Sequence, residues 1–242
     1  MTRVRPLVLF TDFGAADLYV GQVKAVLTAR AARSPLIDAL HDAPAFGIEP
    51  AAHLLAALSA QYPPDAVFLA VVDPGVGGGR DAIVAGIDGR QFVGPDNGLL
   101  SILWQRARRR ECRRIAWRPV PLSSSFHGRD VFAPVAAALA LRRVPRGWLV
   151  PKARPDVLLP SRDLARVIYI DHYGNAVTGL RFTNANATLR VGRRVLRYAR
   201  TFVEARGPFW YENSMGLVEI AAPRANAARA LRLRLGTRVA LR

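Results

Sequence analysis

Along the first 150 residues, short apolar runs alternate with longer segments in which apolar residues recur three and four positions apart. A short apolar run bounded by turn residues is typical of a buried strand, and the three-and-four spacing is typical of a helix with one buried face. The predicted strands are residues 6–13, 36–43, 66–73 and 112–120, and the predicted helices are residues 18–32, 49–62, 99–108 and 130–143. This alternation predicts an α/β sandwich built on a mostly parallel sheet.

Residues 81–98 depart from the alternation, because two apolar runs are separated there only by Asp88 and Gly89. An Asp-Gly pair between such runs favours a tight hairpin. In open α/β sheets, ligands usually bind beyond the carboxyl ends of the strands. Asp12 and Asp73 both stand at the ends of predicted strands, so both are candidates for binding or catalysis.

The second part of the chain has a different pattern. Residues 144–163 contain four prolines and no helical period, and after them apolar and polar residues alternate at period two between turn residues. Period two with frequent turns predicts a small all-β domain, most simply a barrel. We therefore expect an α/β domain at residues 1–150, a linker at 151–163 and a β-barrel domain at 164–242.

The composition fits a folded protein without membrane segments. Hydrophobic residues make up 51% of the 242 positions, which is enough for a sizeable core. We find neither the apolar run of about 18 residues that a bilayer span requires nor a signal peptide at the start. The single cysteine, Cys112, excludes an intrachain disulfide framework. We expect a cytoplasmic location and no membrane partner.

The net charge of +17 raises the question of a nucleic-acid partner. Lysine occurs only at Lys24 and Lys152, so 33 of the 35 basic residues are arginine, which indicates a GC-rich coding sequence. The densest basic run, residues 106–114, is interpreted as a solvated surface, with a polyanion-binding patch as the alternative. We expect no nucleic-acid partner.

The segment VVDPGVGGGR, residues 71–80, has the glycines of a phosphate loop but not its pattern, because neither GxxxxGK[ST] nor GxGxxG is present. Two interpretations stay open. The glycines form a structural turn, or they fold so that Asp73 and Arg80 face each other as an ion pair in a site. Asp12, in TDFG, is likewise either a ligand for a ribose diol or the cap of the next helix, a role that Asp17 could also fill.

The four histidines do not form a metal motif. His41 and His53 occur in apolar strand and helix contexts and are interpreted as ordinary core or surface histidines. His127, in SFHGRD, precedes a predicted helix and is a candidate acid–base residue. No pair of histidines has ligand spacing, so we expect no metal site.

Three further segments carry polar or aromatic residues that could either bind a ligand or serve the fold. The turn GPDNG, residues 94–98, either binds a ligand through Asp96 and Asn97 or simply bends the chain. In IDHYGNAVTG, Tyr173 could stack on a flat heterocycle and Asn175 could bind its polar edge, near the carboxylate of Asp171. Ser214 lies in an aromatic-rich segment, residues 207–221.

Taken together and in this order, six motifs resemble the S-adenosyl-L-methionine hydroxide adenosyltransferases, relatives of the fluorinating and chlorinating enzymes that use the same substrate. The motifs are LFTDFG, VDPGVGGGR, GPDNGLLS, FHGRDVFAPVAAAL, IDHYGN and NSMGLVEIA. The resemblance extends over residues 7–237. It implies an N-terminal α/β domain, a C-terminal β-barrel, and a homotrimer in which each site lies between neighbouring subunits.

The resemblance also implies roles for single residues. The family's catalytic triad falls on Asp73, Arg80 and His127. Its substrate-binding positions fall on Asp12 and Phe46 at the ribose, on Asp171, Tyr173 and Asn175 at the adenine, and on Ser214 at the methionine end. The implied reaction is attack of water or hydroxide on the ribose C5′, which gives adenosine and methionine without a cofactor or a metal.

Two other functions stay open at this stage. A halide transferase of the same fold would make a 5′-halo-5′-deoxyadenosine, although the presence of Asp73, Arg80 and His127 favours water. A non-catalytic protein that binds an adenosyl ligand is the third hypothesis. For the hydrolase, Asp73 and His127 are expected to orient the water and accept its proton, while Arg80 fixes the carboxylate and favours hydroxide. Which of the three takes the proton is left open.

Overall fold

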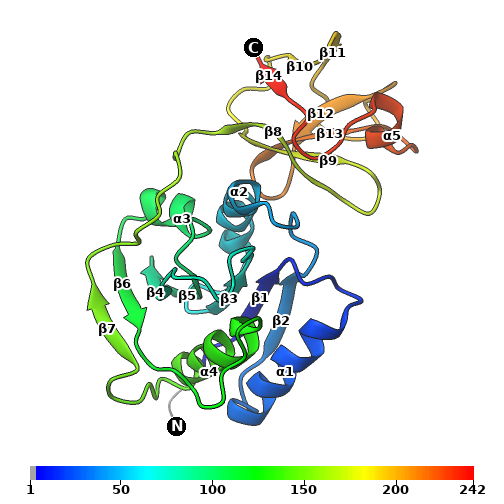
Figure 1. Ribbon diagram of the computed structural model, residues 1–242. Helices are drawn as coiled ribbons and strands as arrows, with labels where there is room; N and C mark the ends of the chain where they lie inside the picture. Colours follow the sequence, from blue (N-terminus) through cyan, green and yellow to red (C-terminus); the bar gives the residue numbers. More distant parts are fainter. Residues whose placement is uncertain (1–3) are drawn as a thin grey trace. The chain divides into compact units, whose positions relative to one another are not determined.

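The computed structural model describes residues 4–242, which form two compact units that divide between Ser161 and Arg162. Figure 1 labels their helices and strands. The elements of the first unit are β1 (Leu7–Thr11), α1 (Leu18–Arg30), β2 (Leu36–Leu40), α2 (Ile48–Leu58), the 3₁₀ turn η1 (Ser59–Gln61), β3 (Val67–Val71), β4 (Ala82–Ile87), β5 (Arg90–Pro95), α3 (Ser101–Arg106), β6 (Arg110–Ile115), the π-helical segment η2 (Gly128–Phe132), α4 (Ala133–Ala140) and β7 (Leu149–Lys152).

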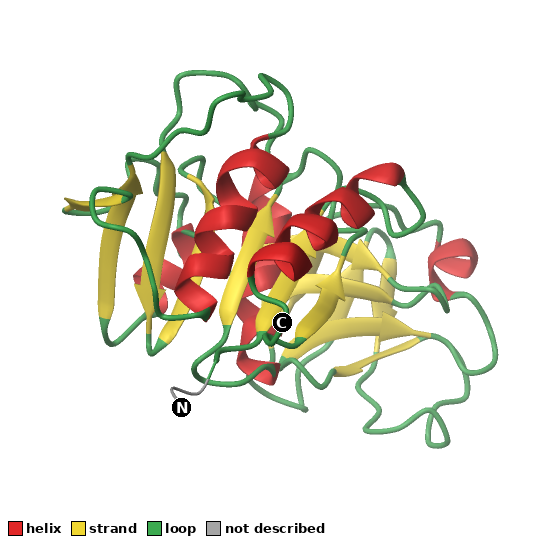
Figure 2. Cartoon of the chain, turned by 90° about the horizontal axis from the view of Figure 1, so that it is seen from below, coloured by secondary structure: helices red, strands yellow, loops and turns green. Residues whose placement is uncertain are grey.

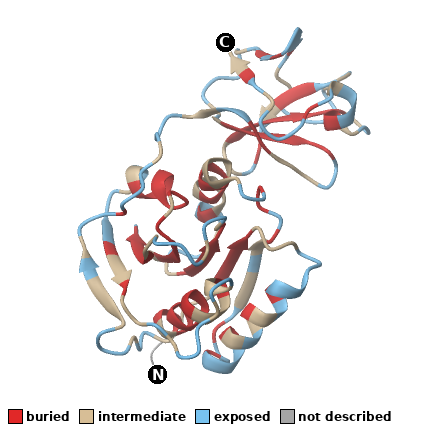
Figure 3. Cartoon of the chain, in the orientation of Figure 1, coloured by how far each residue is buried: buried red, intermediate tan, exposed pale blue. Residues whose placement is uncertain are grey.

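The first unit is built on one mixed sheet with the strand order β2-β1-β3-β5-β4-β6-β7. Neighbouring strands from β2 to β5 are parallel, and those from β5 to β7 are antiparallel. In Figure 1, α1 and α4 lie on one face of this sheet and α2 and α3 on the other. Every residue of β1 and β3 is buried, as Figure 3 shows by colour, because helices cover both faces of these central strands.

Two local predictions are resolved by this unit. Asp88 and Gly89 both have positive φ, 47° and 96°, and join β4 to β5 as the predicted tight hairpin. Asp17, not Asp12, caps α1, since its carboxylate accepts a hydrogen bond from the Leu18 amide at 2.6 Å. Asp12 is therefore not needed as a helix cap.

The segment predicted as a linker, residues 151–163, begins inside β7. This short strand contains Pro151 and pairs with β6 at the edge of the sheet. An edge strand tolerates proline because one side of it needs no hydrogen-bond donors. A four-residue strand with a proline carries little periodic signal, which is why the pattern of the sequence did not indicate it.

The second unit consists of strands, yellow in Figure 2, and one short helix among its described residues. Its elements are β8 (Leu164–Ile170), β9 (Ala176–Arg181), β10 (Leu189–Val191), β11 (Arg194–Leu196), β12 (Phe209–Glu212), β13 (Leu217–Ala221), α5 (Ala227–Leu231) and β14 (Val239–Leu241). They form two antiparallel sheets, β12-β13-β9-β8 and β11-β10-β14.

Two isolated backbone bridges join these sheets into a closed ring. Arg166 of β8 pairs with Arg238 beside β14, and Tyr198, which follows β11, pairs with Trp210 of β12. The fully buried Trp210 belongs to the apolar core of this unit. The unit is thus a small barrel. Across residues 4–242, no helix has both the length and the apolar character needed to cross a bilayer.

Candidate active-site residues

The glycine-rich segment after β3 folds as consecutive tight turns that bring Asp73 and Arg80 together. The Val76 amide donates to the Asp73 carbonyl at 3.2 Å, and the Gly78 amide donates to the Gly75 carbonyl at 3.0 Å. Gly77 has φ of +81°, and a Cβ at that position would overlap the carbonyl oxygen of Ser124. A glycine is therefore required where this turn packs against the segment that leads to His127.

Arg80 contacts both other members of the predicted triad. Its Nε donates to both carboxylate oxygens of Asp73 at 3.1 Å, and its Nη2 also donates to Asp73 Oδ2. The same Nη2 lies 3.2 Å from His127 Nδ1. Phe132 of η2 packs its ring under the guanidinium, 5.4 Å from the ring centre. The structure therefore joins three residues that are up to 54 positions apart in the sequence.

The contact with Arg80 fixes the hydrogen on the His127 ring. A guanidinium has no hydrogen-bond acceptor, so Nδ1 accepts and carries no hydrogen. In the neutral ring the hydrogen then sits on Nε2, which is a donor. Burial, followed by the positive charge of Arg80, lowers the pKa of His127 below its ordinary value. Both effects favour this neutral form.

Asn97 supports the end of β3 directly before Asp73. Its Nδ2 donates to the Val72 carbonyl at 2.9 Å, and its Oδ1 accepts from the Leu99 amide at 3.2 Å. Of the two roles considered for GPDNG, this contact gives Asn97 a part in holding the turn. The sequence offered the GPDNG motif as a signal but not its partner, which lies 25 residues away.

Asp12 follows β1 and lies beside a loop that carries Phe46. One of its carboxylate oxygens, Oδ2, accepts from the Phe46 amide at 3.2 Å. Burial, with a smaller contribution from the negative charge of Asp73, raises the pKa of Asp12. Phe46 has a positive φ of 60° and is 76% exposed. An exposed aromatic ring held in a strained backbone conformation is a candidate contact for a ligand.

Three of the four candidates of the second unit, Asp171, Tyr173 and Asn175, line a cavity of about 670 Å³. Asp171 accepts from the Asn175 amide at 2.7 Å and from the Asn175 side chain at 3.0 Å, which orients the Asn175 amide group. Tyr173 is 74% exposed. The residues that line the cavity are Asp171, Tyr173, Asn175, Phe202, Tyr211, Ala222, Arg224, Ala225 and Asn226.

Ser214 lies outside that lining set, in the turn between β12 and β13. The adjacent Asn213 builds this turn, because its Oδ1 accepts from the Met215 and Leu217 amides, both at 3.0 Å. Asn213 is held in turn by Glu219, a buried carboxylate that also accepts from the Tyr211 hydroxyl at 2.5 Å. Sequence reasoning did not single out Tyr211 or Glu219, although Glu219 lies within the NSMGLVEIA motif, because nothing local in the sequence indicates that the two side chains bond to each other.

A cluster of three carboxylates, Asp81, Asp96 and Asp156, adjoins the triad, since Asp81 follows Arg80 in the chain and its carbonyl accepts from Arg80 Nη1 at 3.5 Å. The ammonium of Lys152 lies among them, 2.9 Å, 3.6 Å and 2.7 Å from their respective oxygens. The lysine provides the positive charge that a metal ion would otherwise bring. We interpret this cluster as an ion-pair network that anchors β7.

The arginine run 106–114 has structural partners for several of its members. Arg110 donates to the Trp104 carbonyl at 2.9 Å, and Arg113 donates to the side chain of Gln91 at 2.8 Å. The amides of Arg108 and Arg109 donate to Asp88 in the β4–β5 turn. These contacts account for part of the run without a polyanion.

Comparison with known proteins gives consistent matches along the whole chain. Residues 7–146 match the SAM hydroxide adenosyltransferase N-terminal domain, and residues 165–240 match the C-terminal domain of that family. A Thermus thermophilus protein named (R)-S-adenosyl-L-methionine hydrolase is 39% identical, over 98% of this chain and 100% of its own length. A protein of the same name from Salinispora arenicola is 38% identical, over 90% of both chains.

Two solved structures share the fold of this chain over nearly its full length. A crystal structure of an uncharacterized conserved protein from Thermotoga maritima has a TM-score of 0.87 at 30% identity, covering 97% of this chain and 99% of that one. A conserved hypothetical protein from Thermus thermophilus has a TM-score of 0.78 at 38% identity, covering 98% and 100%.

Proposed function

Since this chain belongs to the SAM hydroxide adenosyltransferase family, we propose that it hydrolyses S-adenosyl-L-methionine to adenosine and L-methionine. The names of its relatives support this reaction. The single observation that carries the proposal in the structure is the contact of Arg80 with both Asp73 and His127. It assembles charged and polar groups at the carboxyl end of β3, where ligands of such sheets bind.

The reaction forms a bond from oxygen to C5′ and breaks the bond from C5′ to sulfur. The electron pair of the broken bond stays on sulfur, which changes from a sulfonium to the neutral thioether of methionine. The leaving group is already good, so the protein has to place the nucleophile in line behind C5′ and strip it of water. When water is the source of the nucleophile, one proton is released.

We assign Asp73, Arg80 and His127 the role of binding and orienting the nucleophile. Nδ1 of His127 is occupied by Arg80, so the ring can take a proton there only if that contact breaks. Its Nε2 is a hydrogen-bond donor in the neutral form, and Arg80 adds a positive charge nearby. A hydrogen-bond donor and a cation favour an anionic oxygen, with Asp73 available to accept its hydrogen. Hydroxide is therefore the nucleophile that suits this arrangement, and the proton of the water that supplies it is released to solvent before the attack.

We assign the remaining candidates to binding. Asp12 is partly desolvated, so two ribose hydroxyls donating to its carboxylate would replace lost water contacts. Phe46 is assigned to the ribose, on which its exposed ring would pack. In the second unit, Tyr173 would stack on adenine, and Asn175, oriented by Asp171, would bind the polar edge of the base. Ser214 is assigned to the methionine end.

We further propose a homotrimer in which each site draws on the first unit of one copy and the second unit of a neighbour. The division of the candidates supports it, because the triad and Asp12 belong to the first unit and the cavity belongs to the second. Light scattering should give three times the 26.5 kDa of one chain. At a substrate concentration too low for Y173A/N175A to bind it well, both D73N and Y173A/N175A should turn over little substrate. Mixing these two variants and letting subunits exchange should then raise the activity above that of either variant alone, and no rise would contradict a shared site.

We also propose that the protein acts in the cytoplasm. Its one cysteine, Cys112, is a buried free thiol, which is the usual state in a reducing compartment. Fractionation of cells that carry a tagged chain would test this location, and recovery outside the cytoplasm would overturn it.

Incubation of the purified protein with S-adenosyl-L-methionine in halide-free buffer tests the activity. Adenosine and methionine should appear in equal amounts by chromatography, and D73N should form far less. Added chloride should leave the products unchanged. Product formation that depends on chloride would identify a halide transferase, and binding measured by calorimetry without any product would identify a non-catalytic protein.

A further inference from the structure

Several hydrogen bonds hold the backbone on both sides of Asp12. The turn at residues 11–14, which carries Asp12, is tied to the loop at residues 41–46 by backbone and side-chain bonds. The Ala43 amide donates to the Thr11 carbonyl at 3.1 Å, and the Gly14 amide donates to the His41 carbonyl at 2.8 Å. Phe46 completes the set through its bond to Asp12 itself.

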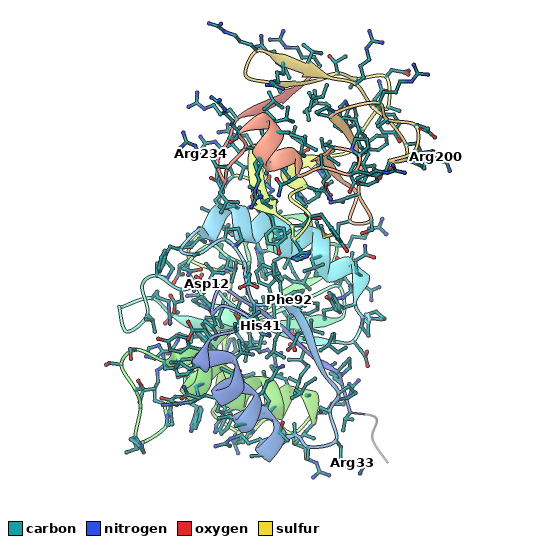
Figure 4. All side chains as sticks on the ribbon, turned by 90° about the vertical axis from the view of Figure 1, so that its right-hand side faces the viewer. Asp12, Arg33, His41, Phe92, Arg200 and Arg234 are labelled. Atoms are coloured by element: carbon teal, nitrogen blue, oxygen red, sulfur yellow. The ribbon has the colours of Figure 1, made fainter. Side chains whose placement is uncertain are left out.

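A chain of side chains runs beneath these bonds. The hydroxyl of Thr11 lies 2.8 Å from His41 Nδ1, and His41 Nε2 lies 3.0 Å from Asp38 Oδ1. Asp38 is held by the ammonium of Lys24 at 2.6 Å. Figure 4 labels Asp12 and His41, which lie in the same part of the first unit.

The chemistry of the groups fixes the direction of each bond. The Asp38 carboxylate only accepts, so His41 Nε2 carries the hydrogen, and Nδ1 of the neutral ring accepts from the Thr11 hydroxyl. The Thr11 oxygen can then accept from the Phe13 amide, which lies 3.4 Å away on the other side of Asp12 in the chain. Asp12 thus stands between Thr11 and Phe13, both of which are held by this series of side-chain hydrogen bonds.

Hydroxyl, imidazole and carboxylate in this order also form the nucleophilic machinery of serine hydrolases. That role does not suit these residues, because Thr11 is 1% exposed and His41 is 7% exposed, so a substrate does not reach the hydroxyl. A polar chain whose inner members, Thr11 and His41, are buried and bonded serves instead to hold backbone in one conformation.

We propose that His41, supported by Asp38, is a positioning residue that sets the Asp12 carboxylate for the ribose hydroxyls of the substrate. The proposal rests on the proposed function, because it assigns Asp12 to the ribose. It replaces the expectation that His41 is an ordinary core histidine. His41 does not touch the substrate; it acts through Thr11 and through its own carbonyl, which holds Gly14.

The test compares substrates rather than rates alone. For each variant, kcat/KM is measured with S-adenosyl-L-methionine and with analogues that lack the 2′ or the 3′ hydroxyl of the ribose. The wild type should prefer the full substrate at least about 10-fold, since two charge-assisted hydrogen bonds are at stake. D12A should lose most of this preference. The ratio does not depend on how much of a sample is folded, so general destabilisation leaves it unchanged.

We expect H41F, which removes both side-chain bonds of His41, to reduce the preference to within about 3-fold of D12A. H41N should retain more of it, because the Asn Oδ1 lies near the place of Nδ1 and still accepts from Thr11. T11V removes the same bond from the other side with little change of volume and serves if H41F does not fold. H53N is the matched control, because His53 is another buried histidine of this unit and should keep the wild-type preference.

The outcomes separate the two proposals. If the wild type forms no adenosine, the proposed function is wrong and this inference falls with it. If the wild type is active and D12A loses the preference while H41F and T11V keep it, the proposed function stands and only the role of His41 is overturned.

Discussion

The two units hold their candidate residues in different ways. In the first unit, Asp73 and His127 both bond to Arg80, which leaves little for a ligand to rearrange. In the second unit, aromatic and amide side chains surround an open cavity of about 670 Å³. Groups that are bonded in advance suit a reaction, since they cost no reorganisation in the transition state. A cavity lined by rings and amides suits recognition. We expect changes in the first unit to act mainly on kcat and changes in the second to act mainly on KM.

The largest effect should come from the first unit. D73N keeps the shape of the side chain but removes the negative charge that faces Arg80, so we expect kcat to fall by about 100-fold to 10,000-fold. KM should change much less. D17N is the control, because asparagine caps a helix about as well as aspartate. A D73N enzyme with nearly normal kcat would remove Asp73 from the reaction.

A substitution at Gly77, in the glycine-rich turn after β3, should reduce the stability of the fold and so test how this turn packs. G77A puts a methyl group against the Ser124 carbonyl and forces an alanine into a left-handed conformation, so we expect a loss of about 1–3 kcal/mol in the free energy of unfolding. Urea denaturation measures this loss. G79A is the matched control, since a methyl group on Gly79 would meet open space and the φ of Gly79 is not positive. Equal losses for G77A and G79A would contradict the packing described for this turn.

In the second unit, Y173A should raise KM by about 10-fold and leave kcat nearly unchanged, because it removes a stacking surface and nothing else. The side chain is 74% exposed, so the fold should tolerate the change. Y173F keeps the ring and should behave like the wild type. A fall in kcat with KM unaffected would remove the distinction drawn between the two units.

The smallest effect concerns pH. Burial and Arg80 lower the pKa of His127, so the neutral ring should persist below about pH 6.5. The loss of kcat/KM that protonation of His127 causes, beyond the fall with hydroxide concentration, should therefore begin only at lower pH. R80M removes the second of these two causes, so the acid limb of its profile should move to higher pH. The same lowered pKa also makes the folded protein less stable as the pH falls below the ordinary value for histidine, because the unfolded chain then binds the proton.

R118M is a graded control for this experiment, because the charge of Arg118 lowers the pKa of His127 less than that of Arg80 does. Its acid limb should move in the same direction by a smaller amount. An R80M profile that keeps its acid limb, or shifts it to lower pH, would contradict the neutral state assigned to His127.

Local signals explain what the sequence could predict. The Asp88-Gly89 hairpin follows from two adjacent residues, and the strands and helices of the first unit follow from short-range periodicity. The facing of Asp73 and Arg80 is one of two interpretations that the sequence leaves open, since glycines permit a turn without specifying it. The structure decides it through Gly77, whose neighbour Ser124 is 47 residues away.

Contacts between distant segments account for what was missed. Asn97 bonds to Val72, 25 residues earlier in the sequence, and His41 bonds to Thr11, 30 residues earlier. A histidine in an apolar context gives no sign of such a partner, so the sequence indicates only an ordinary core residue at His41. The strand β7 was hidden by its length and by Pro151.

The central claim is that oxygen from water becomes bonded to C5′ at the group formed by Asp73, Arg80 and His127. Turnover of S-adenosyl-L-methionine in ¹⁸O-labelled water, followed by mass spectrometry of both products, tests it most directly. The account predicts one ¹⁸O atom in adenosine, at the 5′ hydroxyl, and none in methionine, with the labelled product greatly reduced in D73N. Unlabelled adenosine, or label in methionine, would contradict it.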